Sequence, residues 1–478
     1  MLASHTRQCL SRLFFRRLAR SAWTPLAVLL GVSACGSSDE QQPNPAPERP
    51  VLPTGGCGTA AYSLLPFEGM GRIVDWQYMV ALSVNADFIN AGLEQEGIKG
   101  FSPVPYGVSV YRIRYVTQDK GKEVEATGLI SYPAVSDAQS FPTVLWTHPT
   151  AGFTDACAPS ANGFDGALGN MLLSSQGYVV VAPDYLGMNG MGAPAGFLHP
   201  YLQAEATAIA SLDALRALQR FENGEGDPGL LVRHDGKTVI WGASEGGFAA
   251  LWADRYWKGY APDFDLVATV AVVPPTDLLA LNRAAVDKYR PATGALAAAL
   301  LTLNQWHGDE AHLGDVITDE APYNLASKLP QIVASKCDDG GAFDGITQVD
   351  QVYRQSYIDA VLAGNWDAIE PWACYLRLGT LNRTKIERGH DTPVFFVVAG
   401  ADDLVVADTQ RQDFPVLCSQ GYHMEYYECA GASHVDGAAN SLPAQLQWVQ
   451  KRLAGQPMGD DVCQLTTPVA CASLTGGP

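Results

Sequence analysis

The sequence predicts an α/β fold: a mostly parallel central sheet flanked by helices, with an inserted, mainly helical cap. Its composition, 47% hydrophobic and 17% charged over 478 residues, is sufficient for a large buried core. Short apolar runs alternate with helical stretches along much of the chain, as in doubly wound sheets. The long interval between Pro275 and Thr392 lacks such runs, and it predicts the cap.

The strand-like runs fall into two groups. Runs at 108–116 and 124–132, joined by turn residues Asp119 to Lys122, predict a hairpin. Apolar runs typical of buried parallel strands follow at 141–148, 177–185, 237–244, 265–273, 392–400 and 423–431. Helices fit at 164–176, 202–221, 246–257, 407–420 and 437–453. Because ligands of such sheets bind beyond the carboxyl ends of the strands, we expect the functional site there.

The interval without strands contains helical stretches such as 294–301. A structureless loop of that length would be unusual in a compact domain. We therefore expect a cap at 278–390, inserted between two parts of the sheet domain at 57–277 and 391–455. The last residues, 456–478, are loop-like and predict a C-terminal tail.

The N-terminus predicts an export signal. Five arginines and no acid precede an apolar run at 22–32, which is too short and too broken by proline to span a membrane. The residues Val32-Ser33-Ala34-Cys35 resemble a bacterial lipobox, which implies a signal peptide at 1–34 and a lipid on Cys35. A plain secretory signal cut near Ala34 is the alternative. Residues 35–56 are rich in proline and predict a flexible tether.

The charge of the mature chain excludes some ligands. Without the signal peptide, 26 basic and 50 acidic side chains remain, a net charge of −24. A surface this acidic repels nucleic acid and anionic lipid, so we expect neither as a ligand. Membrane attachment is therefore expected only through Cys35. The chain is expected to be exported, and either anchored to a bacterial membrane surface, with the outer membrane favoured, or secreted.

Eight cysteines remain after Cys9 of the signal peptide and Cys35 are set aside. An even number in an exported chain predicts disulfides, and the absence of a C-x-x-C pattern argues against a zinc or redox site. Sequence alone does not fix the connectivity. Short separations favour the pairs Cys418–Cys429 and Cys463–Cys471, which leaves Cys337–Cys374 and Cys57–Cys157.

The run VIWGASEGGFAAL at 239–251 contains a G-x-S-x-G pattern around Ser244. In a chain with 47 glycines the pattern alone could be accidental. Here a β-rich stretch precedes it and a helical stretch follows it, as a nucleophile elbow requires. Gly242 and Gly246 would avoid clashes between this turn and its neighbours. Ser244 is therefore our candidate nucleophile.

A serine nucleophile needs a base, and the base needs an acid that orients it; in this architecture they follow in the order serine, acid, histidine. His423 and His434 both follow the run at 392–400. His423 begins a predicted strand, where a histidine is more often packed or at an edge. His434 lies on the loop after the last predicted strand, and we expect it to be the base.

Three acids compete to orient that base, Asp402, Asp403 and Asp408, and each could instead cap the next helix. Asp403 directly precedes the apolar turn at 404–406, so we prefer Asp403 to Asp402. Paired acids could also indicate a metal, but no nearby histidine supports one. We expect no metal and no cofactor.

An oxyanion hole needs two donors. The N–H of Glu245 follows the nucleophile at the start of the predicted helix. The second donor usually comes from the loop after the third strand, here at 146–153. Pro149 has no N–H, so we expect Thr150 to supply it. The alternative is that this loop merely packs, with His148 bonded to the backbone.

Five stretches carry a resemblance to a known family: WTHPTAGFTDACAPS (146–160), APDYLGMNG (182–190), HPYL (199–202), VIWGASEGGFAALWA (239–253) and PPTDL (274–278). Together they resemble the secretory lipase family of α/β hydrolases, from about residue 108 to 453. The resemblance implies ester hydrolysis by Ser244, Asp403 and His434, with Glu245 and Thr150 at the oxyanion positions and a cap over an acyl pocket. Relatives usually carry glycine where this chain has Pro149, which stiffens the loop that holds Thr150.

These observations predict an exported serine carboxylic-ester hydrolase of the lipase or carboxylesterase type, acting on a small-molecule or lipid ester. A peptidase or polyester-degrading hydrolase with the same triad is one alternative, because a fold does not fix its substrate. A non-catalytic surface binding protein on a hydrolase scaffold is another.

Overall fold

The computed structural model describes residues 52–95, 103–309, 311–337 and 341–472. The predicted signal peptide, Cys35 and the tether up to residue 51 lie outside the described residues. Within the described part of the chain, no helix is both long and apolar enough to cross a membrane.

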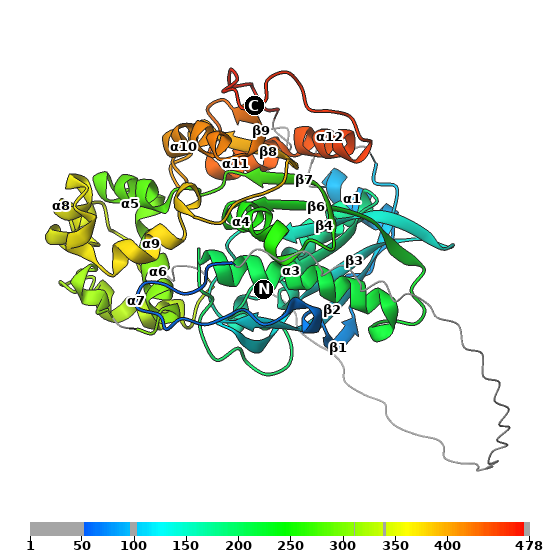
Figure 1. Cartoon of the computed structure of the whole chain (residues 1–478), viewed down its shortest axis with the longest axis horizontal. Coiled ribbons are helices and arrows are strands. Elements are labelled where there is room, and N and C mark those ends of the chain that lie inside the picture. The colour runs from blue at the N-terminus through cyan, green and yellow to red at the C-terminus, as the bar shows by residue number, and fades with distance from the viewer. Residues whose placement is uncertain (1–51, 96–102, 310, 338–340, 473–478) are drawn as a thin grey trace, which may run out of the picture. The chain divides into compact units, whose positions relative to one another are not determined.

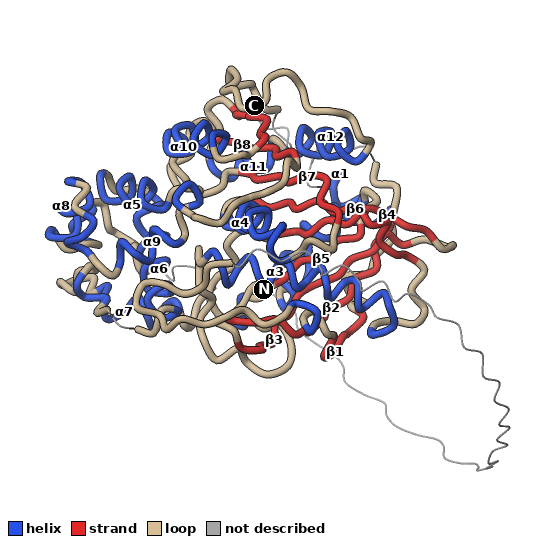
Figure 2. Tube along the Cα trace, in the orientation of Figure 1, coloured by secondary structure: helices blue, strands red, loops and turns tan. Residues whose placement is uncertain are grey.

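A nine-stranded sheet has the strand order β1-β2-β3-β5-β4-β6-β7-β8-β9 (Figures 1 and 2). The strands are β1 (Ile73–Tyr78), β2 (Gly107–Asp119), β3 (Lys122–Ala134), β4 (Gln139–Thr147), β5 (Val179–Pro183), β6 (Val232–Ala243), β7 (Asp265–Val272), β8 (Pro393–Ala399) and β9 (His423–Cys429). The pairs from β1 through β3 to β5 are antiparallel, and the pairs from β5 through β4 to β9 are parallel. The predicted fold class and hairpin are confirmed.

β1 is a strand that we did not predict from the sequence. Val74, Trp76 and Tyr78 alternate with Asp75 and Gln77, as apolar and polar residues do in a half-buried strand, but the strand has only six residues. β1 pairs with β2 at the edge of the sheet.

Helices cover both faces of the sheet: α1 (Ala86–Gln95), α2 (Gly163–Ser175), α3 (Ala204–Arg220), α4 (Glu245–Tyr260), α10 (Ala407–Ser419), α11 (His434–Asn440) and α12 (Leu442–Leu453). Successive residues of β6 serve opposite faces, as the strand period requires. Ile240 packs in the same core as residues of α3 and α4, whereas Val239 and Trp241 pack in the core that contains α12.

Between β7 and β8 the described residues form helices and no strand (Figure 2). These helices are α5 (Leu278–Asp287), α6 (Pro291–Trp306), α7 (Leu325–Val333), α8 (Gln355–Ala363) and α9 (Trp372–Leu378). We call residues 278–390 the cap. Buried side chains of α6, such as Leu296 and Leu300, belong to the core that also contains α3 and α4, so the cap packs continuously onto the sheet domain.

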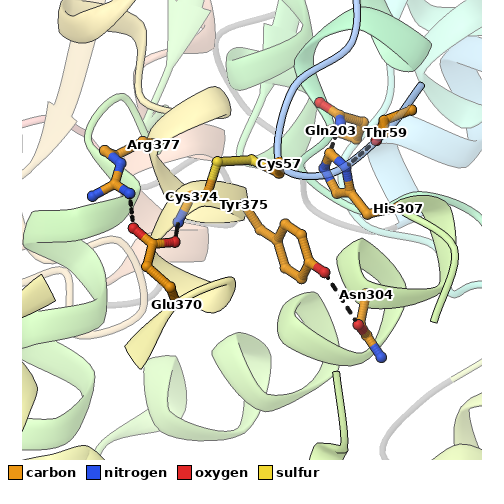
Figure 3. The surroundings of a disulfide bond; sticks show 9 residues. All are labelled: Cys57, Thr59, Gln203, Asn304, His307, Glu370, Cys374, Tyr375 and Arg377. Atoms are coloured by element: carbon orange, nitrogen blue, oxygen red, sulfur yellow. Dashed lines mark hydrogen bonds and ion pairs between the residues drawn. A yellow bond between two sulfur atoms is a disulfide. The ribbon is translucent and has the colours of Figure 1, made fainter. Parts of the chain in front are cut away.

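The eight predicted disulfide cysteines are all paired, but the four pairings that we predicted are wrong. The structure has Cys57–Cys374, Cys157–Cys337, Cys418–Cys463 and Cys429–Cys471. The first two join segments that precede β5 to the cap across 317 and 180 residues. Figure 3 shows the first of them, Cys57–Cys374. Pairings across separations this large cannot be predicted from the spacing of the cysteines in the sequence.

The other two disulfides show why the short pairings fail. Cys418 lies at the end of α10, near the start of β9, whereas Cys429 ends β9 about 20 Å further along the strand. The tail runs beside this strand, because the Cys463 N–H donates to the Met424 carbonyl and Val469 bridges to Cys429. Each tail cysteine therefore meets the cysteine at its own end of β9.

Candidate active site

Ser244 lies in the turn between β6 and α4 with φ 58° and ψ −122°, a left-handed conformation that is rare for residues other than glycine. Its N–H donates to the Val272 carbonyl at 2.8 Å. A Cβ on Gly242 would lie 2.1 Å from the Gly246 carbonyl oxygen, and one on Gly246 would lie 1.9 Å from the Thr147 carbonyl oxygen. Both positions therefore require glycine, and the turn has the geometry of a nucleophile elbow.

His434 comes from the loop after β9 and is the first residue of α11. The preceding Ser433 caps this short helix by accepting a hydrogen bond from the Asp436 N–H. The imidazole Nε2 lies 2.9 Å from the Ser244 hydroxyl oxygen, although 190 residues separate the two in the sequence. The structure thus brings together the two residues that we expected to be nucleophile and base.

The acid differs from the prediction: Asp402, not Asp403, contacts the histidine. Asp402 Oδ2 lies 2.7 Å from His434 Nδ1, and its side chain is fully buried. Its other oxygen accepts hydrogen bonds from the N–H groups of Leu404 and Val405 at 3.0 and 2.8 Å. The apolar turn at 404–406, which led us to prefer Asp403, is therefore held by Asp402. Asp403 is exposed.

This arrangement fixes the protonation pattern of the site. An ionised carboxylate only accepts, so the Nδ1–H of His434 donates to Asp402, and the lone pair on Nε2 accepts the Ser244 hydroxyl proton. A serine, a basic imidazole and a buried carboxylate in this order can perform nucleophilic catalysis on an acyl group. No group of three or more metal-ligating side chains occurs among the described residues.

The two predicted oxyanion donors differ in how closely the structure connects them to Ser244. Glu245 begins α4, so its N–H lies at a helix N-terminus directly after the serine, where a backbone donor can stabilise negative charge. The Thr150 hydroxyl lies 3.1 Å from the Tyr201 hydroxyl. Tyr201 lines the cavity that contains Ser244, whereas Thr150 lines two larger neighbouring cavities. The role of Thr150 stays a prediction.

Sequence reasoning missed the partner of the Glu245 side chain. Its Oε1 lies 2.6 Å from His199 Nε2, and both side chains are fully buried. His199 Nδ1 lies 2.9 Å from the Leu186 carbonyl, to which it must donate because a carbonyl only accepts. The contact with Glu245 therefore shares one proton between a carboxylate and an imidazole. This pair ties the first residue of α4 to the HPYL stretch.

The APDYLGMNG stretch braces the loop at 146–153. The buried Asp184 carboxylate accepts hydrogen bonds from the Thr127 and Ser160 hydroxyls, both at 2.6 Å. The Tyr185 hydroxyl donates to the His148 carbonyl at 3.0 Å, and the Tyr185 ring stacks on the His148 ring at 4.1 Å. These contacts hold the loop that carries the predicted second oxyanion donor.

The cap closes over Ser244 and leaves a cavity of about 30 Å³. The core contributes Ser244 and Glu245, and α6 contributes only apolar side chains, those of Ala292, Ala295, Leu296 and Ala299. A second cavity of about 300 Å³ lies between α6 and α7, and Tyr201 and Ala295 line both. The apolar face of α6 therefore leads from the serine to a larger apolar space.

Comparison with known proteins confirms the resemblance found in the sequence. The family model for secretory lipases matches residues 166–461. A protein of Mycobacterium tuberculosis (strain CDC 1551 / Oshkosh) named as a probable inactive lipase is 24% identical over 78% of this chain and 80% of its own. A secreted triacylglycerol lipase of Malassezia globosa is 22% identical over 73% of this chain and 72% of its own.

Solved structures support the same fold. The rice cell wall degrading esterase LipA from Xanthomonas oryzae matches with a TM-score of 0.65 and 19% identity, over 81% of this chain and 100% of its own. Candida antarctica lipase A in its closed state matches with a TM-score of 0.60 and 16% identity, over 84% and 85% of the two chains. Both matches show that the chain shares the fold of these two proteins.

Proposed function

Because the chain belongs to the secretory lipase family, we propose that it is a serine carboxylic-ester hydrolase that acts through Ser244, His434 and Asp402. The observation that carries this proposal is the pair of hydrogen bonds from Ser244 to His434 and from His434 to Asp402. The similarity to a probable inactive lipase makes activity the question to test, and this chain retains all three side chains in contact.

The geometry supports a two-step acyl transfer. The Ser244 oxygen attacks the ester carbonyl carbon while His434 Nε2 takes its proton, and Asp402 stabilises the resulting imidazolium. The N–H groups of Glu245 and Thr150 are the proposed donors to the oxyanion. The C–O bond to the alcohol then breaks, His434 returns the proton to the departing alcohol, and an acyl-enzyme remains. Water, deprotonated by His434, releases the acid and restores the serine.

We also propose that the acyl group lies along α6. Ala295 lines both the cavity at Ser244 and the larger cavity between α6 and α7, and the other α6 residues at the serine are apolar. An aliphatic chain gains roughly 0.8 kcal/mol for each CH₂ that it buries on such a surface. The apolar lining of the cap therefore favours esters with an aliphatic acyl chain as substrates.

Export and anchoring are separate parts of the proposal. Four disulfides within the described residues require an oxidising compartment during folding, which agrees with the secretory family. The lipid on Cys35 is our proposal from the lipobox resemblance. Metabolic labelling with a fatty-acid analogue in a bacterial host should mark the wild-type protein and spare the Cys35→Ser variant; equal labelling of both would exclude Cys35 as the anchor.

The hydrolase proposal is tested by Ser244→Ala. We expect the purified wild-type protein to hydrolyse nitrophenyl esters and the variant to lose about 10⁴-fold or more in kcat/KM, because the residual groups cannot form an acyl-enzyme. Circular dichroism should show that both proteins are folded. Equal hydrolysis by the two proteins, or none by the folded wild type, would contradict the proposal.

A further inference from the structure

A separate cavity of about 450 Å³ lies behind the catalytic cavity, near the Cys57–Cys374 disulfide (Figure 3). Two chain segments form a wall that this rear cavity shares with the catalytic cavity. At the start of α3, Leu202 lines the catalytic cavity, whereas Gln203 to Glu205 line the rear cavity. In α9, Leu376 lines the catalytic cavity, whereas Arg377 and Leu378 line the rear cavity. The size of this rear cavity is in the range of small-molecule sites.

The interior of the rear cavity is aromatic. Trp252, Tyr256 and Trp306 line it, and they are 2%, 4% and 7% exposed. Trp306 Nε1 donates to the Asp119 carboxylate at 3.0 Å. In contrast, Trp252 Nε1 is buried and has no hydrogen-bond partner in the described part of the chain. Because this nitrogen is buried, Trp252 meets the cavity with its ring carbons and adds to the apolar wall.

One carboxyl group also lines this cavity. Glu205 is buried, and its Oε1 accepts a hydrogen bond from the Tyr62 hydroxyl at 2.5 Å. Burial raises the pKa of Glu205 to about 7, against the lowering effect of the Tyr62 hydrogen bond. Near neutral pH this carboxyl can therefore donate as well as accept, as a site for a ligand hydroxyl requires.

The rim of the rear cavity is basic. Arg377 pairs with Glu370 (Figure 3). Arg383 and Lys385 also line the cavity, are exposed, and form no ion pair with any described residue. In a chain with 50 acidic and 31 basic side chains, two unpaired cations at one opening favour an anionic group there.

We propose that the rear cavity is a binding site for a hydroxyaryl carboxylate. The ring packs against the aromatic wall, the hydroxyl meets Glu205, and the carboxylate meets Arg383 and Lys385 at the rim. This arrangement gives the buried Glu205 carboxyl a hydroxyl partner and neutralises the two unpaired cations in one ligand. The site does not depend on ester hydrolysis, because different residues line the catalytic cavity.

Binding is tested by calorimetry on the folded Ser244→Ala protein with 4-hydroxycinnamate as the probe. We expect saturable binding of one molecule. Cinnamate, which lacks the hydroxyl, and 4-hydroxycinnamyl alcohol, which lacks the charge, should each bind about tenfold more weakly, the effect of one lost polar interaction. Absence of saturable binding would overturn the proposal.

Four variants then locate the ligand. The double variant Arg383→Gln/Lys385→Gln should weaken 4-hydroxycinnamate about tenfold and leave the alcohol unchanged, whereas Arg283→Gln/Lys451→Gln removes two exposed charges elsewhere and should change neither. Glu205→Leu should erase the preference for the hydroxyl. Unchanged binding in the rim variant, or loss of binding on filling the catalytic cavity by Ala295→Trp, would show that the ligand binds elsewhere and overturn the proposal.

Discussion

The elbow around Ser244 and the cap above it meet in one small cavity, but different constraints shape them. At the elbow, Gly242 and Gly246 leave no room for a Cβ, and Ser244 holds a left-handed conformation. On the cap side, α6 presents Ala295, Leu296 and other apolar side chains whose size can change without loss of a hydrogen bond. From this difference we propose that the core fixes the chemistry and that the cap selects the substrate.

The cap is nevertheless tied to the rest of the chain. Cys57–Cys374 joins the N-terminal segment to α9, and Cys157–Cys337 joins the segment after β4 to the residues after α7. Two covalent links at different positions oppose a rigid-body movement of the whole cap away from the serine. Access to Ser244 therefore depends on the side chains along α6 and on local movement between these links.

The largest effect should come from the core. We expect Asp402→Asn to lower kcat about 10⁴-fold for every ester tested, because an amide would stabilise the wrong imidazole tautomer. Asp403→Asn removes the neighbouring, exposed carboxylate and should change kcat by less than about twofold. Steady-state kinetics of the two matched variants decide between them. The reverse ranking would restore Asp403 as the orienting acid.

The difference between these two aspartates also shows which features of the site can be predicted from the sequence. The strand before Ser244, the helix after it and the position of His434 follow from local patterns, which is why these features and the parallel strands could be predicted. The choice between Asp402 and Asp403 depends on which side chain turns inward, and the hydrogen bonds from Leu404 and Val405 decide that in three dimensions. No spacing rule contains this information.

Long-range contacts account for the other misses. The disulfide partners are set by the path of the tail along β9 and by the packing of the cap, neither of which is local. The pair of His199 and Glu245 joins residues 46 positions apart, although both lie in stretches that the family resemblance highlighted. Sequence patterns thus located the important segments but not the contacts between them.

The cap should yield a smaller and selective effect. Ala295→Trp places a large ring where the catalytic cavity meets the space between α6 and α7. We expect kcat/KM for long acyl chains to fall about 10- to 100-fold, with short-chain esters largely retained, since two or three buried methylenes contribute this much. The control Ala363→Trp alters an exposed cap residue. An equal loss for acetate and decanoate esters would assign α6 to catalysis rather than to selection.

The last effect is on stability rather than on catalysis, and it concerns the wall shared with the rear cavity. The pKa of Glu205 is raised from its ordinary 4.5 to about 7, so the folded state binds more protons between these values than the unfolded state. Stability should therefore fall as pH rises from about 4.5 to about 7, by up to about 3 kcal/mol from this group. Glu205→Gln should flatten that part of the profile in urea denaturation, and the exposed Glu387→Gln should not. An unchanged slope in Glu205→Gln would refute the assignment.

The central claim is that Ser244, activated by His434, is a working nucleophile. Its most direct test is reaction of the folded protein with an alkyl fluorophosphonate, followed by peptide mass spectrometry. We expect one equivalent of label on Ser244 in the wild type and at least a roughly 10³-fold slower reaction in His434→Ala, because the serine then lacks its base. A folded wild type that stays unlabelled, or that is labelled equally fast without His434, would contradict the claim.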